Sequence, residues 1–190
     1  TFSQETIQNL PGTELSRDKS ALTPRIGIVY QPIEPISLYA NYSRTFLPNL
    51  TETDVNGDFL DPEEGVGFEV GIRGEIIEDR LIANLAYFDI TKQNVATADP
   101  NAPFFASIAT GEQRSRGVDF NLTGEILSGW NVVASYAYID AEVTEDNDIP
   151  VGNRLGGIPE HSASLWTTYE LQSGDLQGLG FGLGFNFVGE

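Results

Sequence analysis

Cysteine, methionine and long apolar runs are all missing from this chain of 190 residues. Without cysteine, the chain has no disulfide and no thiolate metal site, a composition compatible with an oxidising compartment of the cell envelope. Because no methionine is present, we expect a processed chain or an excised piece of a longer protein. No apolar run reaches the length of about 18 residues that a transmembrane helix needs, whereas a transmembrane β-barrel needs only alternating strands of about 10 residues.

Basic residues and histidine are scarce. The 10 Lys and Arg residues stand against 28 Asp and Glu residues, which gives a formal net charge of −18. Such a chain is repelled by polyanions, so no nucleic acid is expected among its partners. His161 is the only histidine, so it cannot form a histidine metal cage or a histidine pair. We expect His161 to be structural, because no exposed nucleophile with an oriented base accompanies it.

Alternation of apolar and polar residues is the dominant pattern of the chain. In residues 115–126, Val118 and Leu122 are apolar while Asn121 is polar, the period of a strand with one apolar and one polar face. The same alternation predicts strands over 24–31, 36–45, 66–76, 81–92, 115–126, 130–138, 163–171 and 179–188. Residues 1–21 are polar and have no period, so we predict a loop there.

The predicted connections alternate in length. Short turns are expected at Pro32–Pro35, Glu78–Asp79, Ser128–Gly129 and Ser173–Asp175, and long loops at 47–64, 93–113 and 142–160. Successive connections of an antiparallel meander lie on opposite edges of the sheet, so the long loops share one edge. This asymmetry is typical of a bacterial outer-membrane barrel, which has short periplasmic turns and long external loops. A β-sandwich has no reason to sort its loops by length.

Aromatic residues stand near both ends of the predicted strand over residues 130–138. Trp130 lies near the short-turn end, and Tyr136 and Tyr138 lie near the long-loop end, all on the apolar face. The span between them is roughly 20 Å along the membrane normal, close to the apolar band of about 25 Å that aromatic girdles flank. The alternative is that these aromatic residues pack the core of a soluble protein.

Several short runs resemble those of a known family when they are taken in order. They are Pro24–Gly27 (PRIG), Tyr39–Phe46 (YANYSRTF), Phe68–Glu75 (FEVGIRGE), Ser115–Asp119 (SRGVD) and Pro159–Thr167 (PEHSASLWT). In this order and spacing they resemble the C-terminal half of the barrel of TonB-dependent outer-membrane receptors, most of all the ferric-siderophore (ferrichrome-type) branch. The resemblance covers nearly the whole chain from Leu22 onward.

The resemblance implies an all-β fold: an antiparallel up-and-down meander of about eight strands, forming an incomplete segment of a transmembrane β-barrel of about 22 strands. Residues 1–190 are then expected to be a partial barrel domain, with the plug, the TonB-contacting box and the remaining strands absent. It further implies a receptor in the cell outer membrane of a Gram-negative-type bacterium, in contact with outer-membrane lipid. The implied activity is active transport of ferric siderophores or similar chelates, energised by the TonB complex through the missing N-terminal region, without enzymatic activity or a cofactor.

Ligand contact, if this part of a receptor supplies any, is expected in the long loops, because external loops above a rigid barrel form its entrance. Phe59, Phe104 and Phe105 are large apolar residues in otherwise polar loops, suited to an organic chelate. Arg114 can meet the negative charge of such a chelate. The alternative is that these side chains pack loop against loop.

The acidic loops and the strand glycines are predicted to be structural. The run Asp54–Asp58 has its glycine at the fourth place rather than the sixth, so an EF-hand calcium site does not fit and a solvated acidic loop is the better interpretation. Gly180, Gly182 and Gly184 recur at strand period on the polar side, where they are expected to leave room inside a lumen. Charged residues of the polar face are expected to pair across strands; they are Glu69, Arg73, Glu75, Asp119 and Glu125.

Two alternative functions remain open on the sequence alone. One is a self-contained outer-membrane barrel of about eight strands with a structural or adhesion role. The other is a secreted β-sandwich that binds carbohydrate. A sandwich buries its apolar face, so dependence on detergent separates it from both kinds of barrel.

Overall fold

The chain is built of β-strands throughout its described part. The computed structural model describes residues 2–8, 14–20, 22–49, 51–102 and 106–189. The strands are β1 (Phe2–Gln8), β2 (Glu14–Ser20), β3 (Arg25–Ile33), β4 (Ile36–Leu47), β5 (Glu63–Ile77), β6 (Leu81–Ala98), β7 (Ser107–Leu127), β8 (Trp130–Glu145), β9 (His161–Glu170) and β10 (Gly180–Val188). Among the described residues, no helix has the length and apolar character needed to cross a membrane.

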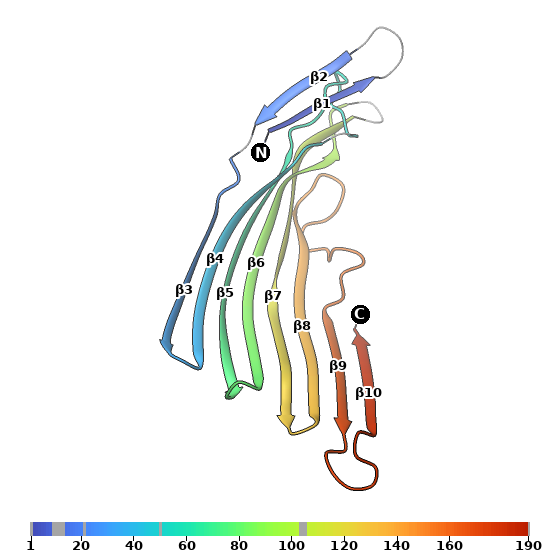
Figure 1. Cartoon of the computed structure of the whole chain (residues 1–190). Coiled ribbons are helices and arrows are strands. Elements are labelled where there is room, and N and C mark those ends of the chain that lie inside the picture. The colour runs from blue at the N-terminus through green and yellow to red at the C-terminus, as the bar shows by residue number, and fades with distance from the viewer. Residues whose placement is uncertain (1, 9–13, 21, 50, 103–105, 190) are drawn as a thin grey trace.

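Strands β3 to β10 form one antiparallel sheet of 8 strands in chain order (Figure 1). Each strand pairs with its neighbour in sequence, so the predicted up-and-down meander is confirmed. β3 and β10 lie at opposite edges, and in the described part of the chain they do not pair with each other. The sheet is therefore open, and every residue of these two edge strands is exposed.

The prediction of a loop over residues 1–21 is wrong. β1 and β2 form a separate antiparallel hairpin, whose register runs from Phe2 opposite Ser20 to Gln8 opposite Glu14. In these two segments polar residues occupy both sets of alternating positions, so no apolar period marks them as strands. A ladder of backbone hydrogen bonds forms without such a period, because its donors and acceptors belong to the main chain.

The predicted long loops are too long, because the strands continue beyond the apolar alternation. β6 runs to Ala98 and β7 starts at Ser107, so the connection predicted over 93–113 covers only 99–106. β8 likewise continues to Glu145 into the loop predicted over 142–160. Towards this edge of β6 and β7, polar residues largely replace apolar ones, so the alternation ends before the backbone ladder does. In β8 the alternation continues, but the apolar residues Ile139, Ala141 and Val143 lie on the polar face.

One predicted short turn is also longer than expected. The β9–β10 connection covers residues 171–179 rather than Ser173–Asp175 alone. It has its own hydrogen-bonded turn, in which the Gly178 N–H donates to the Leu171 carbonyl at 2.9 Å. The two edges of the sheet still differ, because the other connections on this side are the tight turns at 34–35, 78–80 and 128–129.

The apolar face of the sheet carries an unbroken row of apolar residues across all eight strands. We call the side that bears Val118 and Leu122 the apolar face, and the side that bears Asn121 the polar face. Through the strand register the row is Tyr30, Leu38, Ile72, Leu85, Phe120, Tyr136, Ala163 and Phe187. Tyr30 is 63% exposed and Phe187 48% exposed. Within the described chain, no second layer therefore covers this row, although Leu81 and Val132, further along the same face, are buried.

The same row fixes which face of β6 is apolar, although in residues 81–92 apolar side chains occupy both phases of the strand. Leu85 pairs with Ile72 on one side and Phe120 on the other, so Leu85 and Tyr87 belong to the apolar face. Phe88 then belongs to the polar face, opposite Glu69. The clearer alternation of β5 and β7 fixes the phase of β6 because a shift by one residue would exchange its faces.

Two aromatic side chains lie close to glycines of the polar face. A Cβ atom at Gly71 would overlap the Tyr39 ring, and Cβ atoms at Gly184 and Gly182 would lie 2.7 Å and 3.2 Å from ring atoms of Trp166. Aromatic side chains of the sheet therefore fill the space beside these glycines, which the sequence predicted to be left as room inside a lumen. The aromatic rings cover backbone that would otherwise be open.

Gly117 offers a direct test of this packing. Its missing Cβ would overlap the carbonyl oxygen of Tyr138 on the neighbouring strand, so Gly117→Ala should destabilise the folded protein by about 1–3 kcal/mol. Gly27→Ala is the matched control, because its nearest atoms would be 3.9 Å away and it should change stability by less than about 1 kcal/mol. Urea titration of both variants in detergent measures the difference; equal stabilities would contradict the close approach of β7 and β8.

Candidate functional site

The connections 48–62, 99–106 and 146–160 gather at one edge of the sheet (Figure 1). These segments include Phe59 and the predicted contacts Phe104 and Phe105, and strand β7 brings Arg114 towards the same edge. Phe104 and Phe105 lie outside the described residues. The described part of the candidate site consists of the two other loops and the ends of β6, β7 and β8.

Loop 48–62 folds around the carboxylate of Asp54. This carboxylate accepts the backbone N–H of Asn56 at 2.8 Å and of Asp58 at 2.9 Å, and the Asn56 side-chain amide at 3.2 Å. The hydrogen bond from the Asp58 backbone is the main cause that holds the pKa of Asp54 below its ordinary value. Asp54 thus holds its own turn together. Among the described residues, no group of three or more acidic or histidine side chains converges on a metal site.

Phe59 follows this turn and belongs to a short paired segment. It forms an isolated antiparallel bridge with Thr53, and its neighbour Leu60 is buried at 7% exposure. The Leu60 N–H donates to the Glu52 carbonyl at 3.2 Å. Phe59 itself is half-buried. The loop around Phe59 is thus a folded unit with its own small apolar anchor.

Two neighbouring loops are attached to the tip of the β6–β7 hairpin. From one side, Ser107 at the start of β7 donates its N–H to the Thr53 carbonyl and its hydroxyl to Glu52, both at 3.0 Å. From the other side, the Asn147 side-chain amide donates to the Thr97 hydroxyl at 2.6 Å and to the Ala98 carbonyl at 3.0 Å. The loops 48–62 and 146–160 therefore share one support.

Arg114 lies on the extension of the apolar face, not on the polar face. Its guanidinium holds the Asp89 carboxylate with two hydrogen bonds, from Nε to Oδ1 at 2.9 Å and from Nη2 to Oδ2 at 2.5 Å. One row closer to the apolar row, Arg116 donates to Asp140 from Nε at 3.1 Å and from Nη2 at 2.9 Å. Glu142 lies 3.9 Å from Arg116. These residues form a charged ladder across β6, β7 and β8.

The sequence contains a signal for this ladder that the alternation argument did not use. Arg114 and Arg116 precede Val118 at strand period, so they belong to the apolar face by phase alone. The ladder begins where that face stops being apolar. When the alternation is extended beyond the last apolar residue of each strand, both guanidinium groups fall on the apolar face. Asp140, two residues after Tyr138, falls on the same face.

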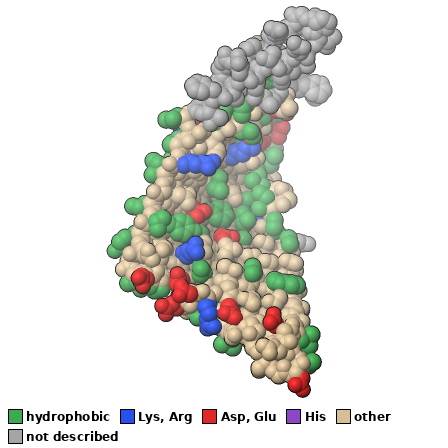
Figure 2. Space-filling model, viewed as in Figure 1, with side chains coloured by type: hydrophobic (Ala, Val, Ile, Leu, Met, Phe, Trp, Pro, Cys, Tyr) green, Lys and Arg blue, Asp and Glu red, His purple; other side chains and the backbone are tan. Residues whose placement is uncertain are grey.

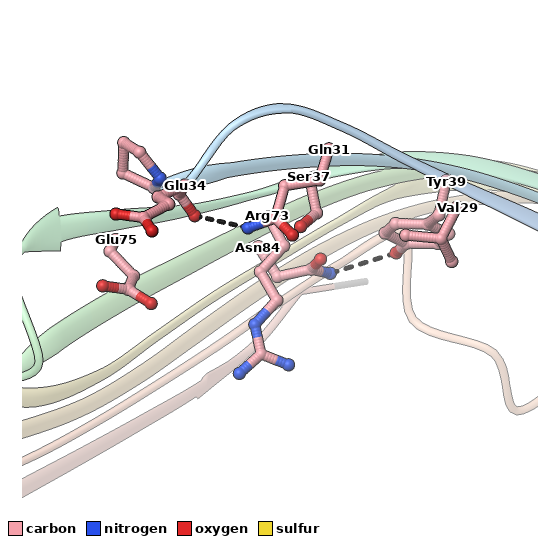
Figure 3. Close-up of a pocket in the computed structure, with 9 residues that line it drawn as sticks. Val29, Gln31, Glu34, Ser37, Tyr39, Arg73, Glu75 and Asn84 are labelled. Atoms are coloured by element: carbon pink, nitrogen blue, oxygen red, sulfur yellow. Dashed lines mark hydrogen bonds between the residues drawn. The ribbon is translucent and has the colours of Figure 1, made fainter.

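Near the opposite edge, the polar face is hollowed by a cavity of about 530 Å³. Figure 3 shows its lining, with Tyr39 accepting a hydrogen bond from the Asn84 amide at 3.3 Å. The Gln31 amide donates to the Glu34 carbonyl at 2.6 Å. The Arg73 guanidinium points away from the strands in this view and forms no ion pair with any described residue. The cavity is therefore lined by one cation and by two carboxylates, those of Glu34 and Glu75.

The expectation that polar-face charges pair with one another is wrong for most of them. Glu69 accepts a hydrogen bond from the Asn41 amide at 3.3 Å, and Asp119 accepts one from Asn121. Glu125 accepts the Gly129 N–H at 2.7 Å and lies 3.9 Å from Arg80. Amides satisfy these carboxylates because few basic side chains are available. Figure 2 shows a group of acidic side chains near the lower turns of the sheet, with Lys and Arg side chains both beside that group and higher on the sheet.

His161 lies at the boundary between the apolar row and the charged ladder. Its Nδ1 and the Tyr136 hydroxyl form a hydrogen bond at 2.9 Å, and its ring centroid lies 5.1 Å from that of Tyr138. On the same face, Trp130 at the other end of β8 donates its indole N–H to the Thr167 hydroxyl at 2.8 Å. Aromatic groups with polar tips therefore stand at both ends of the apolar part of β8, as the sequence predicts.

The whole chain, residues 1–190, matches the family model described as TonB dependent receptor-like, beta-barrel. The metal-pseudopaline receptor CntO of Pseudomonas aeruginosa is 43% identical over 178 residues, which cover 94% of this chain and 25% of the receptor. The ferrichrome outer membrane transporter/phage receptor of Escherichia coli is 36% identical over 187 residues, covering 98% of this chain and 24% of the transporter. The chain thus spans about a quarter of the length of these curated relatives.

Solved structures share the fold. The alcaligin outer membrane receptor FauA of Bordetella pertussis superposes with a TM-score of 0.76 at 27% identity, over 94% of this chain and 31% of the receptor. The Pseudomonas aeruginosa receptor FpvA, bound to heterologous pyoverdines, superposes with a TM-score of 0.78 at 29% identity, over 92% of this chain and 24% of the receptor. Both are similar to this chain in sequence as well as in fold.

Proposed function

The chain belongs to the TonB-dependent receptor family, as part of its β-barrel, and from this premise we propose that the protein imports ferric siderophores or similar metal chelates across the bacterial outer membrane. The observation that carries the proposal is the full-length family match combined with an exposed apolar row across all eight strands. Relatives named for ferrichrome, pseudopaline and pyoverdine support this substrate class. We further propose that TonB energises the import and that the protein catalyses no reaction.

We propose that residues 1–190 are one segment of a larger barrel of about 22 strands. Two observations support this: the sheet is open at β3 and β10, and the relatives extend far beyond the matched part. Unpaired edges cannot contact lipid, because a bilayer offers their backbone groups no hydrogen-bond partner. Further strands, and a plug with the TonB-contacting segment, would come from other parts of the polypeptide. This arrangement is favoured over a closed barrel of eight strands.

The apolar face is proposed to contact lipid, whereas a sandwich would bury it. The apolar row includes Leu38 and Leu85, at 41% and 46% exposure. Exposure of such a row to water costs free energy, whereas contact with the hydrocarbon of a bilayer removes that cost. Above it, the loops 48–62, 99–106 and 146–160 would face the outside of the cell. Ligand contact is proposed for these loops, with Phe59 as the described candidate and Phe104 and Phe105 as further candidates. Arg114, the remaining predicted contact, lies on the extension of the apolar face and is hydrogen-bonded to Asp89.

Lipid contact can be tested at two neighbouring residues of β7. Leu122 is on the apolar face and Asn121 on the polar face, so Leu122→Arg should destabilise the complete barrel by about 2–4 kcal/mol while Asn121→Arg should cost much less. Denaturant titrations of refolding into lipid vesicles compare the two. Equal costs would show that the two faces have been assigned incorrectly.

The orientation of the barrel can be tested with epitope insertions. A tag placed after Asn56, in the proposed external loop, should be labelled by antibody on intact cells. A tag placed after Glu78, in a tight turn at the opposite edge, should be labelled only after the outer membrane is permeabilised. Labelling of the second tag on intact cells would reverse the orientation.

Uptake measurements test the function itself. Cells whose only such receptor is this protein should accumulate at least one of the metal-loaded chelates ferrichrome, pyoverdine or pseudopaline, and uptake should stop when TonB is deleted. Phe59→Ser should raise the concentration for half-maximal uptake, because an apolar contact is lost. Val55→Ser is the matched control: Val55 is an apolar residue of the same loop at 58% exposure, and its change should have no effect. No uptake of any of the three chelates would contradict the proposal.

A further inference from the structure

We propose that Arg114 and Asp89 form a brace that positions the ligand-binding loops, so that Arg114 acts on the ligand through the β6–β7 hairpin rather than by touching it. The inference rests on the proposed function, since it concerns the loops proposed to bind the chelate. It is carried by three observations: the face on which Arg114 lies, the two hydrogen bonds that join its guanidinium to Asp89, and the attachment of both neighbouring loops to the hairpin tip above it.

The first observation is the direction of the side chain. Arg114 pairs by register with Thr91 and Glu142, and it shares the phase of Val118 and Leu122. These residues belong to the face proposed to contact lipid. A chelate that enters the barrel meets the polar face and the loop ends, so the Arg114 guanidinium lies on the far side of the sheet from it.

The second observation is that Asp89 occupies the Arg114 guanidinium. Nε and Nη2 bind both carboxylate oxygens in the parallel geometry that makes Arg–carboxylate pairs specific as well as strong. Arg116 and Asp140 form a second pair, between β7 and β8, in which Nε and Nη2 both donate to the Oδ2 atom of Asp140. Together the two pairs join three successive strands at the level where they pass beyond the apolar row.

The third observation is what stands above the brace. Beyond Gln93 the β6–β7 ladder is irregular: the register shifts on both sides of Val95, and Asn94 adopts a left-handed conformation at φ 59°. Past this irregularity, the hairpin tip carries loop 48–62 through Ser107 and loop 146–160 through Asn147. The β6–β7 ladder is irregular at the base of this tip, and a loop is attached to each side of it. The position of the tip therefore depends on the strand pairing just below the irregularity.

The brace also explains why a modest interaction can matter. Arg114 and Asp89 are 39% and 22% exposed, and a pair of this kind stabilises a whole protein only weakly. Its effect is therefore expected in the local opening of the hairpin tip rather than in global unfolding. Loops held by a tip that opens more often bind the chelate less tightly.

The deciding experiment compares variants that keep the positive charge at position 114. Asp89→Asn and Arg114→Lys both retain that charge while they remove or weaken the two-bond pairing. If Arg114 touched the chelate directly, Asp89→Asn would leave affinity unchanged or improve it, because the guanidinium would be released. If Arg114 is a brace, both variants should raise the concentration for half-maximal uptake by about 3–5-fold, the most that an exposed pair supplies, with the maximal rate unchanged.

The measurement uses the complete receptor in outer membranes, with whichever of metal-loaded ferrichrome, pyoverdine or pseudopaline the unaltered protein imports. Arg80→Gln is the control, because Arg80, in the turn just before β6, forms an ion pair with Glu125 of β7 at 3.9 Å near the opposite edge of the sheet. It should not change uptake. Unchanged affinity in Asp89→Asn, with uptake intact in the unaltered protein, would overturn the brace while leaving the proposed function standing.

A second readout does not depend on the ligand. Amide hydrogen exchange of residues 95–98 and 107–111 should accelerate in Asp89→Asn and Arg114→Lys, and it should not change in Arg80→Gln. If the unaltered protein imports none of the three chelates, the proposed function fails, and the exchange data alone decide whether the brace exists. Unchanged exchange at the tip in both variants would overturn it.

Discussion

The continuous ladder of backbone hydrogen bonds from β3 to β10 is the constraint on which the rest of this structure depends. In a hydrocarbon environment each unpaired N–H or C=O group is costly, so a chain that crosses it as strands must pair every one of them with a neighbour. Once the ladder is fixed, each residue is assigned to one of two faces by its position alone. The apolar row from Tyr30 to Phe187 and the amide-lined polar face both follow from that assignment.

The centres of the strands could be predicted from the sequence because the two faces meet different environments there. Where Leu122 alternates with Asn121, the residues themselves record which side each occupies. The end of β8 was missed because its apolar residues, Ala141 and Val143, change to the polar face there. The ends of β6 and β7 were missed because both faces there carry mainly polar groups, so the alternation disappears while the ladder continues. The β1–β2 hairpin was missed for the same reason. The length of an alternating stretch therefore indicates how much of a strand has one face in an apolar environment. It does not indicate the full length of the strand.

The candidate site was less predictable than the fold. Loop composition identified Phe59 as an apolar residue in a polar segment, and the structure places it in a folded turn. The contacts of Ser107 and Asn147 could not be predicted, because they depend on how far β6 and β7 extend past their neighbours. The role of Arg114 depended on phase: its charge suggested ligand contact, whereas its position in the alternation put it on the side of Val118. The residue type of Arg114 indicated which chemical group it could bind, but not the face of the sheet on which its side chain lies.

The aromatic rings that cover glycines on the polar face tie pairs of positions together. The Trp166 ring fills the space beside Gly184, as the Tyr39 ring fills the space beside Gly71. A larger side chain at either glycine is compatible with the fold only if the aromatic partner becomes smaller at the same time, since the two share one volume. Over evolutionary time, Gly184 and Trp166 should therefore be retained or replaced together. Substitutions at the two positions should covary and should not count as independent changes.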